Sequence, residues 1–307
     1  METRTADPDL AHGAANKANP IVTAIKETLT DETLGMILNL AEESVRVNYD
    51  KVTGLYSPEK FEADGIAMMG ANLHILITDI GYLGYVNEVS GHSGGDEYKR
   101  RVANIVGGKT EEMKMFMKDN EIESKGYALT RGDEMGILME GSKEKAELLA
   151  TKIREEVEKI GKITPNSELN ASISIGMVSE DEFGEELATF FAAHESSDKK
   201  LTTFKFLARA AIFRSELDKV KERLREMVTV QKNDPEKFER LSIYLGKGVI
   251  GVDEKLRKRL SESTDYEADS ETLIKEIIRG RKEIDLQEAT DPLQKFMIEM
   301  ELKMLGE

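Results

Sequence analysis

Three carboxylates fall at positions where a folded sheet would bring them together. Asp79 lies near the end of an apolar segment, and the pair Asp133 and Glu134 lies in a short polar connection between two further apolar segments. If the segments are neighbouring strands, the three side chains meet over one sheet edge. Two carboxylates and a backbone carbonyl form a hard oxygen site suited to Mg²⁺, which keeps water and phosphate oxygens as its other ligands. Each carboxylate alone also fits a structural role at a strand end or in a turn.

The apolar pattern predicts the elements that position these carboxylates. Leu73–Ile80 is apolar on both faces, which is typical of a central strand covered on two sides. The expected elements are, in order, a strand at Leu73–Ile80, a helix at about 94–118, a hairpin of strands Gly126–Leu129 and Met135–Met139, a helix at Lys143–Ile160 and a strand at Asn170–Val178. This β-α-β-β-α-β order predicts an α+β domain of the ferredoxin-like or polymerase-palm type, an antiparallel sheet with helices on one face.

Composition limits the classes of protein and of ligand. The 307 residues include 59 acidic and 43 basic side chains, a formal net charge of −16. Such an acidic surface repels nucleic-acid backbones, so we expect no nucleic-acid polymer as partner and only a small phosphate-bearing ligand. Cysteine is absent, which excludes disulfides and thiolate chemistry. The sequence has no apolar run of about 18 residues and no signal peptide, so we expect a cytoplasmic protein without membrane contact.

Four regions are expected along the chain. Residues 1–20 are small and polar, which predicts a disordered tail. Within 21–49, apolar residues recur at steps of three and four and predict a helical stalk, which either packs on its own domain or dimerises. The sheet-containing domain is expected at 50–214. The remainder, 215–307, is expected to be helical, and its Met-rich last helix is expected to be core or a surface for a protein partner.

Five blocks in this order extend the pattern well beyond the carboxylates. They are Asp50–Tyr56, Thr78–Ile80 followed by Asn87–Asp96, Arg131–Met135, Ser172–Gly176, and the spaced residues Asp198, Leu201, Lys205 and Arg209. Together they resemble the D-x-L-T-G-L, D-I-D…N-D-x-x-G-H-x-x-G-D, GGDEF, S-I-G and A-D-x-A-L-Y-x-A-K-x-x-G-R blocks of the GGDEF family, the diguanylate cyclases. The resemblance covers about half of the chain.

Gly94–Tyr98 reads Gly-Gly-Asp-Glu-Tyr and looks more like the signature pentapeptide than Arg131–Met135 does. Its context differs, because it lies inside the G-H-x-x-G-D block at the start of a predicted helix. The signature must lie in a hairpin between two strands, and only 131–135 meets that condition.

The resemblance implies a role for each matching residue near the metal. Asp79 and Asp133 would bind Mg²⁺ or Mn²⁺, the Ile80 carbonyl would help, and Glu134 would lie beside them.

The resemblance also implies a GTP site. Asn87 and Asp96 would bind the guanine edge, because an Asp accepts from both the N1–H and the exocyclic amine, a pattern that adenine lacks. Lys205 and Arg209 lie four apart on one helix face and would reach the same phosphates. Without the resemblance, that pair would equally suit a solvated helix face.

Several positions depart from the family pattern. Arg131 replaces the first signature glycine, beside Gly132. In the family, glycine here lets the backbone approach the phosphates closely, and the Arg131 side chain obstructs that approach. Alternatively, the Arg131 guanidinium itself points at the phosphates. Gly81 replaces the second Asp of D-I-D, Gly84 replaces the following Lys, and Met135 replaces the signature Phe. The family's R-x-x-D motif for product inhibition has no counterpart at 122–125.

The resemblance predicts condensation of two GTP into cyclic di-GMP, each protomer of a homodimer holding one GTP and one metal ion. A second interpretation, motivated by the departures, is a catalytically degenerate GGDEF module that binds GTP or a protein partner through helices 215–307 as a regulatory domain. A third is a palm-type nucleotidyl cyclase that uses another base.

Overall fold

The computed structural model describes residues 36, 48–129, 132–165, 167–194, 198–234, 236 and 266–306. The chain divides into two compact units, Met1–Asn48 and Tyr49–Glu307, and the second contains all but two of the described residues. The predicted tail at 1–20 and nearly all of the predicted stalk at 21–49 therefore lie outside the described residues.

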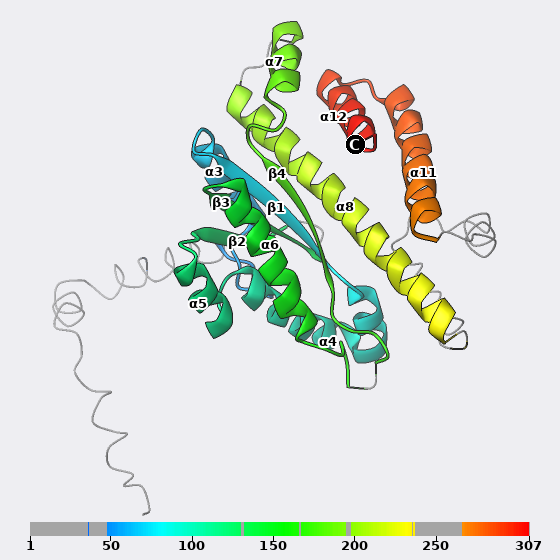
Figure 1. Cartoon of the computed structure of the whole chain (residues 1–307). Coiled ribbons are helices and arrows are strands. Elements are labelled where there is room, and N and C mark those ends of the chain that lie inside the picture. Colours follow the sequence, from blue (N-terminus) through cyan, green and yellow to red (C-terminus); the bar gives the residue numbers. More distant parts are fainter. Residues whose placement is uncertain are drawn as a thin grey trace, which may run out of the picture. The chain divides into compact units, whose positions relative to one another are not determined.

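The second unit is built on one antiparallel sheet of four strands (Figure 1). The strands are β1 (Leu73–Ile80), β2 (Ser124–Ala128), β3 (Glu134–Glu140) and β4 (Ile173–Ser179), in the spatial order β2-β3-β1-β4. With α4 (Leu83–Val106) after β1 and α6 (Lys143–Glu158) after β3, the order confirms the predicted β-α-β-β-α-β fold.

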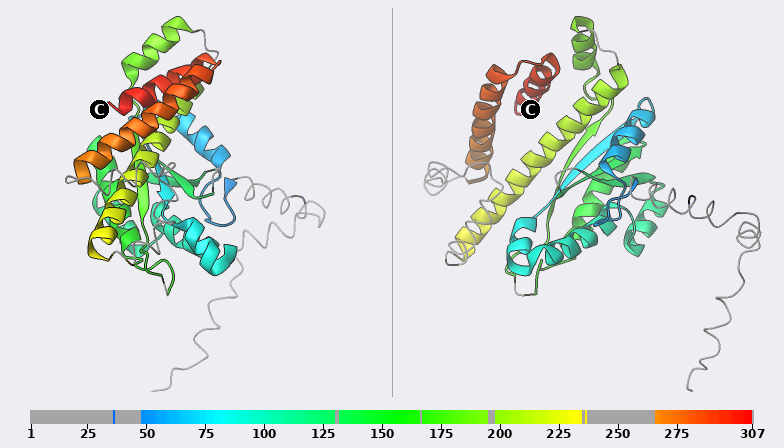
Figure 2. Two further views of the ribbon diagram at one scale, coloured as in Figure 1. Left: turned by 90° about the vertical axis from the view of Figure 1, so that its right-hand side faces the viewer. Right: turned by 180° about the vertical axis from the view of Figure 1, so that it is seen from behind.

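Helices cover both faces of the sheet, whereas the sequence pattern predicted them on one (Figures 1 and 2). Helices α4 and α6 pack together on one face, and α3 (Pro58–Met68) packs with α8 (Lys199–Asn233) on the other. The two-sided cover agrees with β1, in which seven of the eight residues are buried. Helix α3, which contains Gly65, has a weak amphipathic pattern and was not predicted.

Helix α8 runs along the edge strand β4 and comes unusually close to it at Gly176. A Cβ at this position would lie 2.1 Å from the Ala211 carbonyl oxygen and 2.2 Å from the Ser215 nitrogen, both in the α8 backbone. Side chains from α8 also pair with the exposed edge: Asp218 accepts from the Ile175 N–H at 2.9 Å, and Arg214 donates to the Met177 carbonyl at 2.8 Å. The helix therefore covers an edge whose backbone groups would otherwise need water.

The helix predicted at about 94–118 is in fact two helices with an earlier start. Helix α4 begins at Leu83, kinks at Gly91 with φ 69°, and ends at Val106. After Gly107 and Gly108, Thr110 caps the short α5 (Glu111–Asp119) by accepting from the Met113 N–H. The kink requires positive φ, a conformation that glycine adopts without steric cost.

Three further helices complete the described part of the chain. Helix α7 (Gly184–Ala193) was not predicted, whereas α12 (Pro292–Met304) begins at the predicted Asp-Pro pair, with Asp291 accepting from the Gln294 N–H at 2.9 Å. Helix α11 (Tyr266–Glu288) precedes α12, and both contact α8. The predicted boundary at 214/215 falls inside α8, and the division into domains stays a prediction.

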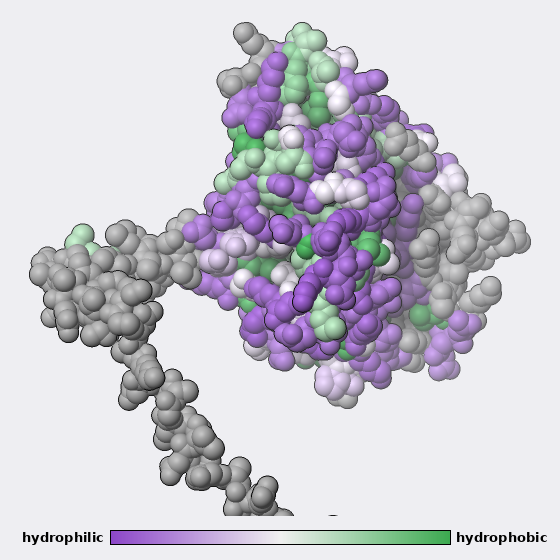
Figure 3. Space-filling model, turned by 60° about the vertical axis from the view of Figure 1, so that its left-hand side comes forward, coloured by the Kyte–Doolittle hydropathy of each residue, from purple (hydrophilic) through white to green (hydrophobic). Residues whose placement is uncertain are grey.

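The surface is mainly polar on the face shown in Figure 3, where hydrophilic side chains cover most of the area. This agrees with the formal net charge of −16. Among the described residues, no helix combines the length and the apolar character needed to cross a membrane.

The close approach at Gly176 gives a prediction for stability. Gly176→Ala forces a methyl group into the α8 backbone, so we expect a loss of about 3 kcal/mol in the free energy of unfolding. Gly184→Ala is the matched control, because a Cβ there meets nothing within 4 Å. Urea unfolding of the full chain measures both, and equal stability of the two variants would contradict the close packing.

Candidate functional site

The structure brings Asp79, Asp133 and Glu134 together at one end of the sheet. Asp79 lies directly opposite Glu134 in the β1–β3 ladder, and the Ile80 N–H donates to the Asp133 carbonyl at 3.1 Å. Glu134 is buried and Asp133 is half-buried. The antiparallel register therefore places Asp79 and Glu134 on neighbouring strands, with Asp133 in the turn directly before β3.

Side-chain alternation decides which helix faces Asp79. Ile77 lies between Gly136 and Gly176 in the sheet, and these glycines face Phe61 of α3 and the backbone of α8. Because residues two apart in a strand share a face, Asp79 also faces α8. Its carboxylate meets Lys219 of that helix, with Nζ 2.7 Å from Oδ1 and 2.9 Å from Oδ2.

Burial dominates the electrostatics of Asp79. It raises the pKa of the carboxyl group above its ordinary value, the Lys219 ammonium opposes that shift, and the neighbouring Asp133 adds to it. The Arg223 guanidinium, one helical turn beyond Lys219, also favours the ionised carboxylate. Burial lowers the pKa of Arg223 to about 9, which leaves it charged at neutral pH.

The oxygen atoms at this end of the sheet fit a magnesium or manganese ion whose coordination shell is completed by a substrate. In the part of the chain that the structure describes, no group of three or more His, Cys, Asp or Glu side chains is arranged to hold a metal ion. Two carboxylates, Asp79 and Asp133, and the Ile80 carbonyl are what the chain itself offers. Mg²⁺ commonly takes one or two carboxylates from the protein and completes its shell with water and phosphate oxygens.

The kink in α4 brings the two predicted base-reading residues close in space. A Cβ on Gly95 would lie 1.9 Å from Oδ1 of Asn87, so the Asn87 side chain packs directly against the residue before Asp96. The Asp96 side chain is 39% exposed, with Lys99 Nζ 3.9 Å away. An amide and a carboxylate thus lie together on the two arms of one bent helix.

The hairpin carries Gly132 in a left-handed conformation with φ 75°. The position where its Cβ would lie is 3.9 Å from the Lys99 ammonium, so a cation from α4 reaches the hairpin. The preceding Arg131 lies outside the described residues. The false pentapeptide at Gly94–Tyr98 lies inside α4, which confirms that it is not in a hairpin.

Lys205 is placed away from the carboxylates. It lies 14 residues before Lys219 on the same helix, about 21 Å along the axis at 1.5 Å per residue. It is half-exposed and forms an ion pair with Glu62 of α3 at 3.7 Å. The structure therefore does not bring Lys205 to Asp79.

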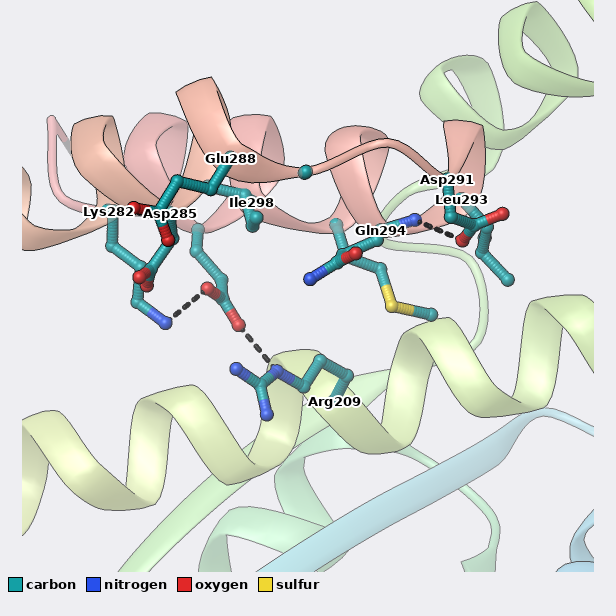
Figure 4. A pocket seen from close by; sticks show the side chains of 11 residues that line it. Arg209, Lys282, Asp285, Glu288, Asp291, Leu293, Gln294 and Ile298 are labelled. Atoms are coloured by element: carbon teal, nitrogen blue, oxygen red, sulfur yellow. Dashed lines mark hydrogen bonds and ion pairs between the residues drawn. The ribbon is translucent and has the colours of Figure 1, made fainter.

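Arg209 also lies elsewhere, about 15 Å along the helix axis from Lys219. It lines a pocket of about 540 Å³ between α8, α11 and α12 (Figure 4). Its Nε donates to Glu301 Oε1 at 2.7 Å, and Lys282 Nζ lies 2.6 Å from Oε2 of the same carboxylate, which is 1% exposed. Arg209 thus belongs to a buried charged junction that joins the C-terminal helices to α8.

The cations beside Asp79 are Lys219 and Arg223, which sequence reasoning missed. They have the same spacing of four residues as Lys205 and Arg209, displaced by 14 residues, or about four helical turns. Spacing alone cannot choose among the pairs on one long helix, since Lys221 and Arg225 are also four apart. The signal that selects the pair at 219 and 223 is the contact at Gly176, because it fixes Ala211 and Ser215 beside β4 and so places Lys219 one turn further, beside Asp79.

Comparison with protein families gives one match. The family model described as "Diguanylate cyclase, GGDEF domain" matches residues 47–205. No curated protein matches this chain.

Among solved structures, several GGDEF-domain proteins show a limited similarity to this chain. The coiled coil and GGDEF domain of DgcB from Caulobacter crescentus, in complex with c-di-GMP, shares 17% identity over 52% of this chain and 83% of its own, with a TM-score of 0.41. Diguanylate cyclase SiaD in complex with its activator SiaC from Pseudomonas aeruginosa shares 17% over 64% and 67%, with a TM-score of 0.40. The FimX GGDEF domain from Pseudomonas aeruginosa shares 15% over 56% and 93%, with a TM-score of 0.40.

A matched pair of substitutions distinguishes the role of Lys205 and Arg209 from that of Lys219 and Arg223. The resemblance implies GTP binding, and we expect Arg223→Gln to weaken it at least tenfold, since the substitution removes a charged donor beside Asp79. Arg209→Gln should leave GTP affinity within twofold and instead lower the free energy of unfolding by about 1–3 kcal/mol, through loss of its bond to buried Glu301. Calorimetric titration measures the GTP affinity, and urea unfolding measures the stability. A loss of GTP affinity in Arg209→Gln and not in Arg223→Gln would instead support phosphate binding by Arg209.

Proposed function

Because the chain belongs to the diguanylate cyclase GGDEF-domain family, we propose that it condenses two GTP molecules into cyclic di-GMP with Mg²⁺ or Mn²⁺. The observation that supports this most is the cluster at the end of β1, where Lys219 and Arg223 of α8 face the largely buried Asp79, whose side chain is 15% exposed, beside the Asp133–Glu134 hairpin. Carboxylates that could bind a metal ion and cations that could bind phosphates therefore lie close together at the end of β1.

Within this site the carboxylates would hold the metal and the cations would hold the phosphates. Asp79, Asp133 and the Ile80 carbonyl would bind the ion, and the chemistry it would supply there is Lewis acidity toward the 3′-hydroxyl and the α-phosphate. Lys219 and Arg223 bind the β- and γ-phosphates, with Arg offering a planar set of donors and Lys a point charge. Gly132 leaves room for the hairpin backbone to approach the same phosphates.

The bent helix α4 supplies base selection. Asn87 and Asp96 lie together across the kink, and Asp96 is exposed enough to accept from a ligand. A carboxylate accepts from both N–H groups on the guanine edge and finds no such pair on adenine. GTP over ATP is therefore the expected preference.

One domain holds one GTP, so we propose that turnover needs a homodimer. Dimerisation is the natural point of control, and the stalk predicted from the sequence would enter the domain at the turn at Asp50. Asp50 Oδ1 accepts from the Thr53 N–H at 2.7 Å and from the Thr53 hydroxyl at 2.6 Å, and the Asp50 N–H donates to the Leu55 carbonyl at 2.8 Å. These bonds stabilise the turn at 50–55, at the start of the domain.

We propose in addition that the C-terminal helices offer a surface for a protein partner. The domain division at 50–214 and 215–307 and a cytoplasmic location belong to the same proposal. A GGDEF module that binds GTP without turnover is the competing function. The observation that favours it is at Gly81, where a Cβ would lie 2.1 Å from the Ser172 hydroxyl and 2.9 Å from its carbonyl oxygen, so the family's second Asp has no room.

Product analysis distinguishes the two functions. With Mg²⁺ and GTP at high protein concentration, the wild type should form cyclic di-GMP, and Asp133→Ala should form less than about one hundredth as much, because it removes a metal ligand. Asp119→Ala, on the exposed end of α5, is the matched control and should keep full turnover. Mass spectrometry of the products gives the answer. GTP bound without any product from the wild type would establish the binding module.

The missing family lysine gives a separate prediction. Gly84 is exposed and a Cβ there meets nothing within 4 Å, so Gly84→Lys is tolerated and should tighten GTP binding about threefold to tenfold by adding a phosphate contact. Gly81→Asp is the contrasting variant, expected to lower the melting temperature by several degrees through its clash with Ser172. Unchanged GTP affinity in Gly84→Lys would mean that the phosphates do not pass the start of α4.

A further inference from the structure

Tyr82 lies at the corner between β1 and α4 in a backbone conformation that does not suit it. Its φ of 62° and ψ of 16° are left-handed, and it precedes α4 as the N-cap residue without a side-chain capping bond. For a residue with a bulky side chain, that conformation costs about 1–2 kcal/mol, which glycine or asparagine would largely avoid. A tyrosine here is explained only if its side chain contributes something that those residues lack.

The Tyr82 side chain contacts the same face of α8 that faces Asp79. The Arg223 guanidinium lies over its ring, 3.0 Å from the ring centroid, and its hydroxyl donates to Glu226. Lys219, Arg223 and Glu226 are spaced four and three apart, so they lie along one side of the helix. Tyr82 therefore touches the phosphate-binding side of α8 from the β1–α4 corner.

That corner is held firmly. The Gly81 N–H donates to the Ser172 carbonyl at 2.8 Å, and the buried Tyr98 hydroxyl donates to the Gly81 carbonyl at 3.2 Å. Tyr82 itself is 6% exposed, so its ring has little freedom to move. A ring fixed to the strand that carries Asp79 is a suitable support for a long, otherwise flexible side chain.

Stacking supports Arg223 without consuming its hydrogen bonds. An aromatic ring contacts the flat face of a guanidinium, whose N–H donors all lie in the plane and stay directed at its edges. Arg223 Nη1 is 3.8 Å from the Glu226 carboxylate, an additional lateral restraint. Arg223 is 4% exposed, so these contacts also restrict it to few orientations.

We infer that Tyr82 is a positioning residue, which holds Arg223 in the orientation needed to bind the phosphates of GTP. This inference rests on the proposed function, since it assigns Arg223 to the nucleotide. Tyr82 acts through Arg223 and makes no contact with the reacting atoms. Its effect is therefore expected to vanish when Arg223 is removed.

A double-mutant cycle on the full chain tests this. The affinity for the α,β-methylene analogue of GTP, which resists transfer, is measured with Mg²⁺ by calorimetry. Tyr82→Leu should weaken binding about fivefold in the wild-type background and less than twofold in the Arg223→Gln background. Tyr82→Phe keeps the ring and should bind within twofold of the wild type, even though it loses the bond to Glu226. Tyr82→Asn, which adopts the left-handed backbone readily, repeats the test if Tyr82→Leu does not fold.

The outcomes separate the inference from the function beneath it. Equal losses for Tyr82→Leu in both backgrounds, or no loss in either, overturn the positioning role while GTP binding stands. Failure of Tyr82→Phe to preserve affinity also overturns it, because the ring would then not be the cause. A wild type that does not bind the analogue overturns the proposed function, and the inference with it.

Discussion

The contact between the α8 backbone and Gly176 is the constraint on which the site depends. Helix α8 can approach β4 so closely only at Gly176, because any side chain at that position would prevent the approach. The glycine therefore fixes the position of the helix along the strand. From that point, four residues of helix and two residues of strand advance by almost the same distance, about 6 Å. Lys219 therefore meets Asp79 as a direct result of Ser215 meeting Gly176.

Secondary structure could be predicted from the sequence wherever it depends on a local pattern of residues. The limits of β1, the hairpin around Asp133, and the cap at Asp291 all follow from apolar periodicity and turn chemistry, and the structure confirms them. The β-α-β-β-α-β order along the chain follows from the same pattern. Neither α3 on the second face nor the break after Val106 was predicted, because a weakly amphipathic α3 and a pair of glycines in a helical stretch give ambiguous signals.

The Lys-Arg pair beside Asp79 shows why other features could not be predicted from the sequence. Helix α8 has a Lys and an Arg four apart at three places, 205/209, 219/223 and 221/225, and all three pairs have the spacing of the Lys and Arg in the family block. Which pair reaches the carboxylates depends on the position of the helix against β4, a tertiary contact that spacing does not encode. The departures at Gly81 and Gly84 are likewise both glycines in the sequence, but their surroundings differ in the structure. Gly81 is enclosed by Ser172, whereas the space around Gly84 is open.

The junction at Glu301 has a mechanical consequence for the C-terminal helices. Apolar helix contacts allow small slips, but a carboxylate that is 1% exposed and shared by Arg209 and Lys282 does not, since a slip would leave a buried charge without its partners. The C-terminal pair is therefore locked to α8 in a single register. Helix α8 also carries Lys219, so the C-terminal helices and the surroundings of Asp79 are connected through one continuous helix.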